Sequence, residues 1–343
     1  MSATIQTLLG QGWRTGHGIL LGSGPSTGGV AVRSIFVAPS GSHVYAGSGN
    51  GPSYAILQYS QAAGVLTALS PASVTLSTNV ASELVVSPDG GYLYASAGGF
   101  VFQFSIASGL LTPLSPAAVT VAGAQGIAIS PDGNYLYVAS NSGNVVHQFS
   151  IGVGTGLLTP LSPATVATGT SPWRVAVSPD GLNLYVTNFT ANTVSQYSIS
   201  SGLLTALSPA SVATGTTPYG IVVHPDGTRV YIAHNGDGIV GQYSRSSGLL
   251  TRETSFDAAT TAAAPRAVSV SPDGLHVYVV CANSGSNTVN QFAVVAGRLQ
   301  LMTPGGVSSS VLGANGLAMV PTESFFFTAH GSTGNVVRRF ARN

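Results

Sequence analysis

Seven proline-centred turns recur along this 343-residue chain at a nearly constant spacing. Successive prolines are 49, 43, 48, 46, 47 and 49 residues apart, and Asp-Gly follows five of them. A period of this length along most of a chain indicates an array of similar units rather than unrelated domains. The seven prolines are Pro39, Pro88, Pro131, Pro179, Pro225, Pro272 and Pro321.

Each unit can be written as four short strands, and the fourth unit shows the pattern best. Apolar residues alternate on both sides of Pro179-Asp180-Gly181, which predicts a tight turn between two strands. A parallel β-helix would need a much shorter repeat, and a helical solenoid would need a 3.6-residue period, which is absent. Four antiparallel strands in each of seven units predict an all-β, seven-bladed β-propeller. The expected strands of this unit are residues 173–178, 183–188, 193–199 and 203–207.

We expect a single propeller domain over residues 1–343. The last unit lacks its fourth strand, and residues 4–9 resemble the fourth-strand pattern of residues 203–207. We therefore predict that residues 1–10 complete the last blade and close the ring, which removes an exposed strand edge. Residues 11–29 are expected to form a glycine-rich arm, and the repeats to span about 30–78, 79–121, 122–170, 171–216, 217–262, 263–311 and 312–343.

Several positions keep the same kind of residue in almost every unit, which favours packing over catalysis because a catalytic group is needed only once. A tyrosine in the second strand should fill the space between blades. A glutamine in the third strand should satisfy backbone groups at blade edges. The third residue before each proline is mostly small, which suits a position where blades converge on the axis. The tyrosines are Tyr45, Tyr94, Tyr137, Tyr185, Tyr231 and Tyr278, and the glutamines are Gln58, Gln103, Gln148, Gln196, Gln242 and Gln291.

Charged residues make up only 6% of the chain, against roughly 25% in ordinary soluble domains. The chain has no lysine and a net charge of +1, so it lacks the basic surface that nucleic-acid binding requires. No apolar run reaches the roughly 18 residues of a membrane span, so we expect no membrane insertion. A surface rich in Ser, Thr, Asn and Gly suits contact with protein or carbohydrate. Cys281 is the only cysteine and is expected to be buried in a strand.

The stretch Tyr185-Val186-Thr187-Asn188, within Ser-Pro-Asp-Gly-x-x-Leu-Tyr-Val-x-Asn, resembles the signature of the YVTN-repeat β-propellers. Weaker copies surround Pro131 and Pro272, and the resemblance covers about residues 30–343. It implies a propeller similar to those of surface-layer and cell-surface proteins and of the lactonase-type propellers, which include 6-phosphogluconolactonases. The lactonase-like relatives use Arg, Glu and His in the channel. Fold alone does not choose between these functions.

One set of positions differs from unit to unit and is therefore a candidate for chemistry. It lies six residues before each proline, where the first strands of the blades should meet at one mouth of the central channel. The aromatic residues in this set could stack on a sugar or another planar ligand. The predicted binding residues are Arg33, Gln125, Trp173, Tyr219, Arg266 and Asn315, with Ser82 completing the ring, and Glu83 and Arg174 lie one residue further inward.

If the protein is a lactonase, Glu83 is the predicted general base, and Arg174 with the mouth arginines stabilises the developing oxyanion. Alternatively, Glu83 and an arginine form a structural ion pair that plugs the channel. The sequence contains no recognisable metal or dinucleotide motif, so we expect no metal and no cofactor. No histidine occupies a first-strand mouth position. His234 and His330 follow second strands and are expected at the same face as the mouth. His43, His224 and His276 are expected to face solvent at the opposite turns.

The sequence leaves two functions open. The low charge, the absence of lysine and the near-identical Ser/Thr/Gly-rich loops favour a non-enzymatic binding or structural module on a cell surface or in an assembly such as a virion. The resemblance and the Arg/Glu cluster favour the alternative, a lactone hydrolase of the 6-phosphogluconolactonase type. We take the binding module as the first expectation, with an extracellular surface or virion as its location, although residues 1–10 do not resemble a secretory signal.

Overall fold

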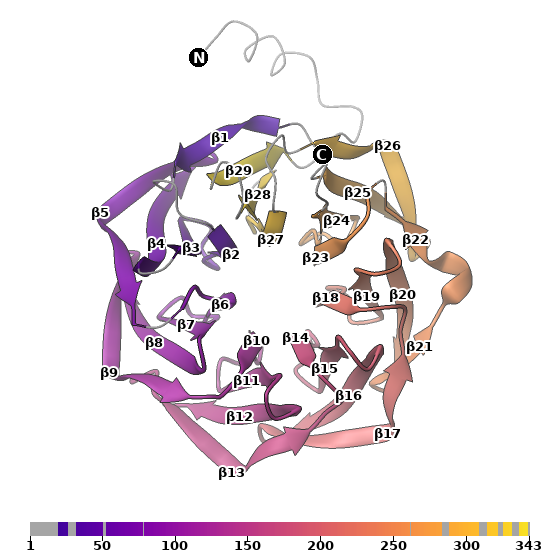
Figure 1. Ribbon diagram of the computed structural model, residues 1–343, viewed down its shortest axis with the longest axis horizontal. Coiled ribbons are helices and arrows are strands. Elements are labelled where there is room, and N and C mark those ends of the chain that lie inside the picture. The colour runs from indigo at the N-terminus through magenta and orange to yellow at the C-terminus, as the bar shows by residue number, and fades with distance from the viewer. Residues whose placement is uncertain are drawn as a thin grey trace, which may run out of the picture.

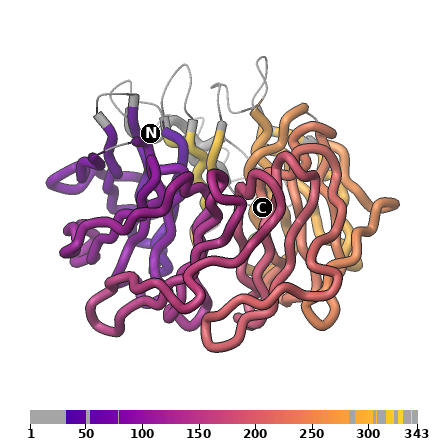
Figure 2. Tube along the Cα trace, turned by 60° about the horizontal axis from the view of Figure 1, so that its bottom comes forward, coloured from indigo at the N-terminus to yellow at the C-terminus, as the bar shows by residue number. Residues whose placement is uncertain are grey.

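The computed structural model describes residues 20–26, 32–50, 53–77, 79–260, 262–282, 288–308, 314–321, 325–330 and 336–341. The strands in these residues form seven sheets. The sheets stand around a central axis, and the first strand of each repeat lies innermost (Figure 1). Figure 2 shows the first blade, in indigo, next to the yellow strands of the last. The prediction of an all-β propeller with four-stranded antiparallel blades is confirmed.

The strands occupy equivalent places in successive blades. From the axis outward, blade one contains β2 (Val32–Val37), β3 (His43–Asn50), β4 (Ser53–Ala62) and β5 (Val65–Leu76), and blade two contains β6 (Glu83–Val86), β7 (Tyr92–Ala97), β8 (Phe100–Ala107) and β9 (Leu110–Thr120). Blade three contains β10 (Ala124–Ile129), β11 (Tyr135–Ser140), β12 (Val145–Ile151) and β13 (Leu158–Ala167), and blade four contains β14 (Pro172–Val177), β15 (Asn183–Asn188), β16 (Thr193–Ser200) and β17 (Leu203–Ala213). Blade five contains β18 (Pro218–Val223), β19 (Arg229–His234), β20 (Ile239–Ser246) and β21 (Leu249–Arg252), followed by the 3-10 helix η1 (Thr254–Phe256) and β22 (Ala258–Ala259), which pairs with β20. Blade six contains β23 (Pro265–Val270), β24 (His276–Cys281), β25 (Thr288–Val295) and β26 (Arg298–Ser308), and the last sheet contains β27 (Ala314–Met319), β28 (Phe325–His330), β29 (Val336–Ala341) and β1 (Leu20–Ser26).

The outermost strand of the last sheet comes from the N-terminal part of the chain, but not from the segment that the sequence predicted. Strand β1 pairs antiparallel with β29, whereas its residues 20–26 were assigned to a glycine-rich arm. That part of the arm prediction is wrong. Glycine weakens a strand, and β1 contains two glycines, which is why its sequence did not indicate a strand. Residues 1–10, the predicted closing strand, lie outside the described residues.

The outer strands run further than predicted because a register shift lets their pairing continue. Residues 208–213, expected to be a loop, extend β17 beyond a shift between Ser195 and Tyr197 of β16. At this shift Gln196 Nε2 donates to the Pro209 carbonyl at 2.8 Å, and Gln196 Oε1 accepts from the Leu250 N–H of the next blade at 2.9 Å. The glutamine row therefore satisfies backbone groups, as predicted, and also links neighbouring blades. Gln58, Gln103 and Gln148 make the same pair of bonds.

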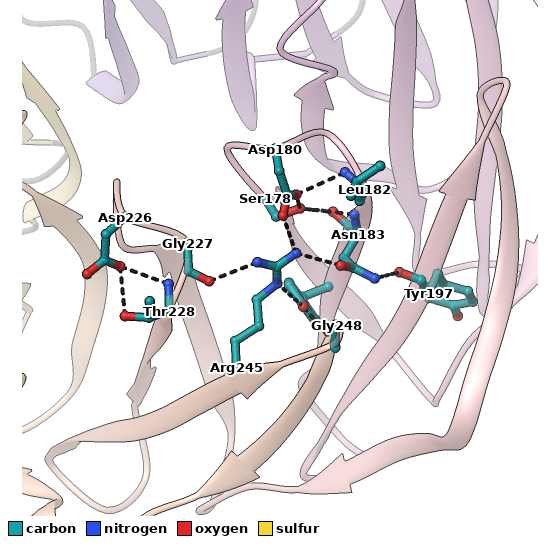
Figure 3. Close-up of polar contacts among 11 residues, drawn as sticks. Ser178, Asp180, Leu182, Asn183, Tyr197, Asp226, Gly227, Thr228, Arg245 and Gly248 are labelled. Carbon is teal, nitrogen blue, oxygen red and sulfur yellow. Dashed lines mark hydrogen bonds and ion pairs between the residues drawn. The ribbon is translucent and has the colours of Figure 1, made fainter.

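The tyrosine row is buried between blades, as predicted. Tyr185 is fully buried, and its hydroxyl donates to the Gly248 carbonyl of blade five at 2.7 Å. The same junction holds Arg245, which extends from β20 into blade four (Figure 3). Its guanidinium donates to Asp180 and Asn183 at 2.6 Å each and to the Tyr185 hydroxyl at 2.9 Å. Polar contacts thus add to aromatic packing at this junction.

The hydrophobic core lies between adjacent sheets rather than along the axis. One cluster, for example, joins Val32 and Val44 of the first blade to Ala318 and Phe327 of the last. Cys281 is buried in β24, as predicted, and burial raises the pKa of its thiol to about 11. Within the described residues, no helix is long and apolar enough to cross a membrane. Because the hydrophobic contacts that stabilise the fold lie between blades, the residues that face the axis are not needed for the core. They can therefore form a binding or catalytic site.

Candidate active site at the channel mouth

The variable positions at the start of the inner strands meet at one end of the channel. They line a cavity of about 410 Å³. Because each inner strand begins at the same level, the ring brings residues from all the blades into one space. Every predicted binding residue lines this cavity: Arg33, Gln125, Trp173, Tyr219, Arg266 and Asn315. Arg174 and Ser82 line it as well.

A second cavity of about 370 Å³ lies further along the axis. The two cavities share five residues, which therefore lie at the level where the mouth meets the inner channel: Arg33, Ser82, Arg174, Arg266 and Asn315. Glu83 lines the inner cavity and not the mouth cavity. A ligand that enters from the mouth therefore passes the arginines before it reaches the Glu83 carboxylate.

Glu83 begins β6 and is held in place by two contacts. Its Oε2 accepts the Ile127 N–H at 2.8 Å, and its Oε1 lies 3.6 Å from Arg174 Nε. The Glu83 side chain is 28% exposed and the Arg174 side chain 17%. Burial raises the pKa of Glu83, and Arg174 and the Ile127 N–H only partly oppose this effect. A carboxyl group with a raised pKa at the edge of a cavity is suited to proton transfer.

The aromatic side of the mouth is built from three rings. Trp173 and Tyr219 are both half-buried, and their ring centroids are 5.2 Å apart. Phe189, in the turn between β15 and β16, lies 5.7 Å from Trp173 and 6.1 Å from Tyr219. The Arg174 and Arg266 guanidinium groups lie 5.8 and 5.9 Å from the centre of the Tyr219 ring. Tyr219 thus helps to hold both arginines at the mouth.

Arg266 has a further partner at the mouth. Its Nη1 donates to Asn315 Oδ1 at 2.6 Å. This bond joins the inner strands of the last two blades and fixes the direction of the guanidinium. Three arginines around one carboxylate leave an excess of positive charge in the channel, which favours a ligand or a transition state that carries negative charge.

The histidines do not contribute to this site as expected. His234 is fully buried against Tyr243, and burial lowers its pKa to about 4, with Arg252 acting in the same direction. His224 is also buried rather than solvated, because its ring lies 2.7 Å from Asp226 and 2.9 Å from the Gly274 carbonyl. The side chain of His330 lies outside the described residues. No described histidine lines either channel cavity.

Two ion pairs in and after blade five do not line the mouth cavities. Arg229 Nη1 lies 2.9 Å from Glu253 Oε2, and Arg252 Nη2 lies 2.8 Å from Asp257 Oδ2. Among the residues that the structure describes, no group of three or more His, Cys, Asp or Glu side chains is placed to hold a metal ion.

The sequence profile of the family described as "Lactonase, 7-bladed beta-propeller" matches residues 22–171 and 160–259. These matches span more than half of the chain, so the protein belongs to this lactonase family of β-propellers. The resemblance noted in the sequence is thereby confirmed. A search of curated protein sequences finds no match.

Solved structures show the same fold at low sequence identity. A candidate 6-phosphogluconolactonase from Bacteroides uniformis is 18% identical, with a TM-score of 0.70 over 80% of this chain and 84% of that one. A periplasmic gluconolactonase from Pseudomonas aeruginosa is 18% identical, with a TM-score of 0.67 over 91% and 88% of the two chains. A protein from Lactobacillus plantarum is 17% identical, with a TM-score of 0.71 over 95% and 91%.

The family membership corrects our first expectation of function. The expectation of a non-enzymatic binding or structural module on a cell surface or virion is wrong, because the chain belongs to a lactonase family. The low charge and the Ser/Thr-rich loops misled the sequence interpretation, since they describe the outer surface and not the channel. The alternative, a lactonase-like hydrolase, agrees with the findings.

Proposed function

We propose that this protein hydrolyses a lactone in the channel, with Glu83 as the general base. The observation that carries the proposal is that Glu83 lines an open cavity beside Arg174 while its pKa is raised by burial. Membership of the lactonase family supports the same chemistry. The mouth aromatics Trp173 and Tyr219 are proposed to bind the face of the substrate ring.

The proposed reaction needs one proton acceptor and a cationic group near the carbonyl. The Glu83 carboxylate takes a proton from a water molecule, whose oxygen attacks the lactone carbonyl carbon. The carbonyl oxygen becomes an oxyanion, which Arg174 with Arg33 or Arg266 stabilises. When the tetrahedral intermediate collapses, the ring C–O bond breaks and the protonated Glu83 returns its proton to the leaving alkoxide. The product is an open-chain hydroxy acid.

The plug hypothesis fits the observed contacts less well. A structural ion pair should fill the channel and keep its carboxylate ionised through strong attraction. Instead, Glu83 and Arg174 are 3.6 Å apart at their closest charged atoms, both border cavities, and burial of Glu83 outweighs the attraction of Arg174 in setting its pKa. Burial of the ionised Glu83 carboxylate lowers the free energy of unfolding. Such a loss of stability is typical of catalytic residues.

A pH profile of lactone hydrolysis tests this proposal. Only the ionised Glu83 can accept a proton, and burial raises its pKa above the ordinary glutamate value of 4.5. Activity should therefore fall as the pH decreases through an apparent pKa above 4.5, at a higher pH than an ordinary glutamate would give. A panel of five- and six-membered lactones, with and without sugar hydroxyls, should be followed by proton release. The absence of hydrolysis across the panel would overturn the proposal.

We also propose that β1 closes the ring of seven sheets, so that the chain forms one propeller domain. Its pairing with β29 supports this, because without β1 the strand β29 would present a free edge. A variant that begins at residue 27 is expected to aggregate and to unfold at a lower temperature than the full chain. A variant that begins at residue 11 keeps β1 and serves as the control. Equal melting temperatures and a monomeric state for both variants would contradict the closure.

A further inference from the structure

The inner cavity is polar at one end and apolar at the other. Its polar end is the ring of Arg33, Arg174, Arg266 and Asn315, with Glu83 just inside. Beyond this ring the side chains that line the cavity are mostly hydrophobic, and most of them are half-buried, with one side packed against the hydrophobic clusters between blades. The side chains that matter here are Phe36, Val85, Ala128, Ile129, Val177 and Val268.

The register of the inner strands puts this apolar lining on the side of Glu83 that faces away from the mouth. Val85 follows Glu83 by two residues in β6, so both side chains lie on the same face of the strand, about 7 Å apart along it. Ala128 and Ile129 follow Ile127, whose N–H holds the Glu83 carboxylate. The proposed base is thus placed between a charged mouth and an apolar channel.

We propose that the substrate is a lactone carrying an alkyl or acyl substituent, with the lactone ring at the arginines and the apolar chain in the inner channel. This proposal rests on the lactonase function above and specifies its substrate class. A fully hydroxylated sugar lactone would leave half-buried hydrophobic side chains in contact with water. An alkyl chain would cover them, and burial of each methylene favours binding by about 0.8 kcal/mol, or about fourfold.

Hydrolysis of a series of γ-lactones tests this inference. From γ-valerolactone, which carries a methyl group, to γ-decalactone, which carries a hexyl group, kcat/KM should rise by about fourfold per methylene until the cavity is full. Measured hydrolysis of the short lactones with a flat or falling dependence on chain length would overturn the inference and leave the proposed function intact. If no lactone is hydrolysed, the proposed function fails. In that case, calorimetry with the same lactones measures whether the inner channel binds the alkyl chain. Equal affinities for the methyl and hexyl compounds would overturn the inference.

Two variants connect the chain-length effect to the channel. Ala128→Leu adds bulk to the lining, so the ratio of kcat/KM for γ-decalactone to that for γ-valerolactone should fall at least about tenfold. Ala117→Leu, at an exposed position of the outer strand β9, is the matched control and should keep the wild-type ratio. Should Ala128→Leu fail to fold, Val268→Thr makes the lining polar at nearly constant volume and should lower the ratio several-fold. If the folded channel variants keep the wild-type ratio of kcat/KM for the two lactones, the alkyl chain of the substrate does not bind in the inner channel, and the inference is overturned.

Discussion

Glu83→Gln is expected to lower kcat for lactone hydrolysis by about 10²–10⁴-fold without lowering the melting temperature. The amide has nearly the shape of the carboxylate and can still accept the Ile127 N–H through its oxygen. It cannot take a proton from water, so the attack on the carbonyl loses its base. Steady-state kinetics at pH 7 and thermal unfolding of the same preparation measure both effects.

The effect on stability follows from the raised pKa of Glu83. A group whose pKa is higher in the folded state than in the unfolded state stabilises the fold at low pH, where it is protonated. That contribution is lost as the pH rises through the folded-state pKa. At pH 7 the ionised carboxylate therefore opposes folding, and the glutamine variant should melt at the same or a higher temperature. This advantage should disappear near pH 4.

Glu253→Gln is the matched control for this experiment. Glu253 also pairs with an arginine, and both members of the Arg229–Glu253 pair are 22% exposed, so the variant removes a similar charge outside the channel. It should leave kcat close to the wild-type value. A Glu83→Gln variant that keeps its activity but melts at a clearly lower temperature would favour the structural plug instead.

The sequence contained enough information to predict the blades and the composition of the mouth. The spacing of prolines such as Pro179 defines the register of every repeat, and counting six residues back from each proline identifies a mouth residue without structural information. The role of Gln196 was also predictable, because a buried amide repeated in six of the seven repeats must satisfy backbone groups. These predictions succeed because the same pattern recurs in several repeats, so an assignment that is ambiguous in one repeat is supported by the others.

The sequence was less informative wherever the repeat is broken. Residues 4–9 have stronger strand propensity than the glycine-containing β1, so the sequence did not predict a strand at residues 20–26. His224 replaces the serine that precedes the turn proline in four other repeats, and its ring turns inward to the Gly274 carbonyl. Phe189 could have been found, since it is an aromatic residue in a turn that is otherwise polar or small in the neighbouring blades.

The depth of Glu83 relative to the mouth was beyond sequence reasoning. Position numbers place Glu83 and Arg174 at the same level, yet Arg174 borders both cavities while Glu83 borders only the inner one. The difference arises because the long arginine side chain extends toward the mouth aromatics, whereas the shorter carboxylate is held by the Ile127 N–H of the neighbouring blade. The directions of the two side chains decide whether Glu83 and Arg174 form a structural ion pair or an active site. The residue types alone do not determine these directions.

Arg174→Gln is expected to lower kcat/KM by about 10²–10³-fold, because it removes a cationic donor from the oxyanion. A second effect should accompany this loss. Arg174 lowers the pKa of Glu83, so its removal should raise that pKa further and move the acid limb of the pH profile to a higher pH. Arg174→Lys keeps the positive charge and should restore most of the pH profile, but only part of kcat/KM, since an ammonium group lacks the fork of the guanidinium.

The pH profile separates this catalytic role from simple support of the fold. A residue that only stabilised the blades would reduce the amount of folded enzyme without moving the acid limb. Arg229→Gln breaks the matched Arg–Glu pair of blade five and should show just this behaviour, with a wild-type pH profile and at most a modest loss of stability. An Arg174→Gln variant with the same profile as Arg229→Gln would remove Arg174 from the site. A shift confined to Arg174→Gln would show that the guanidinium acts on the Glu83 carboxylate during turnover, as the 3.6 Å separation of the two groups predicts.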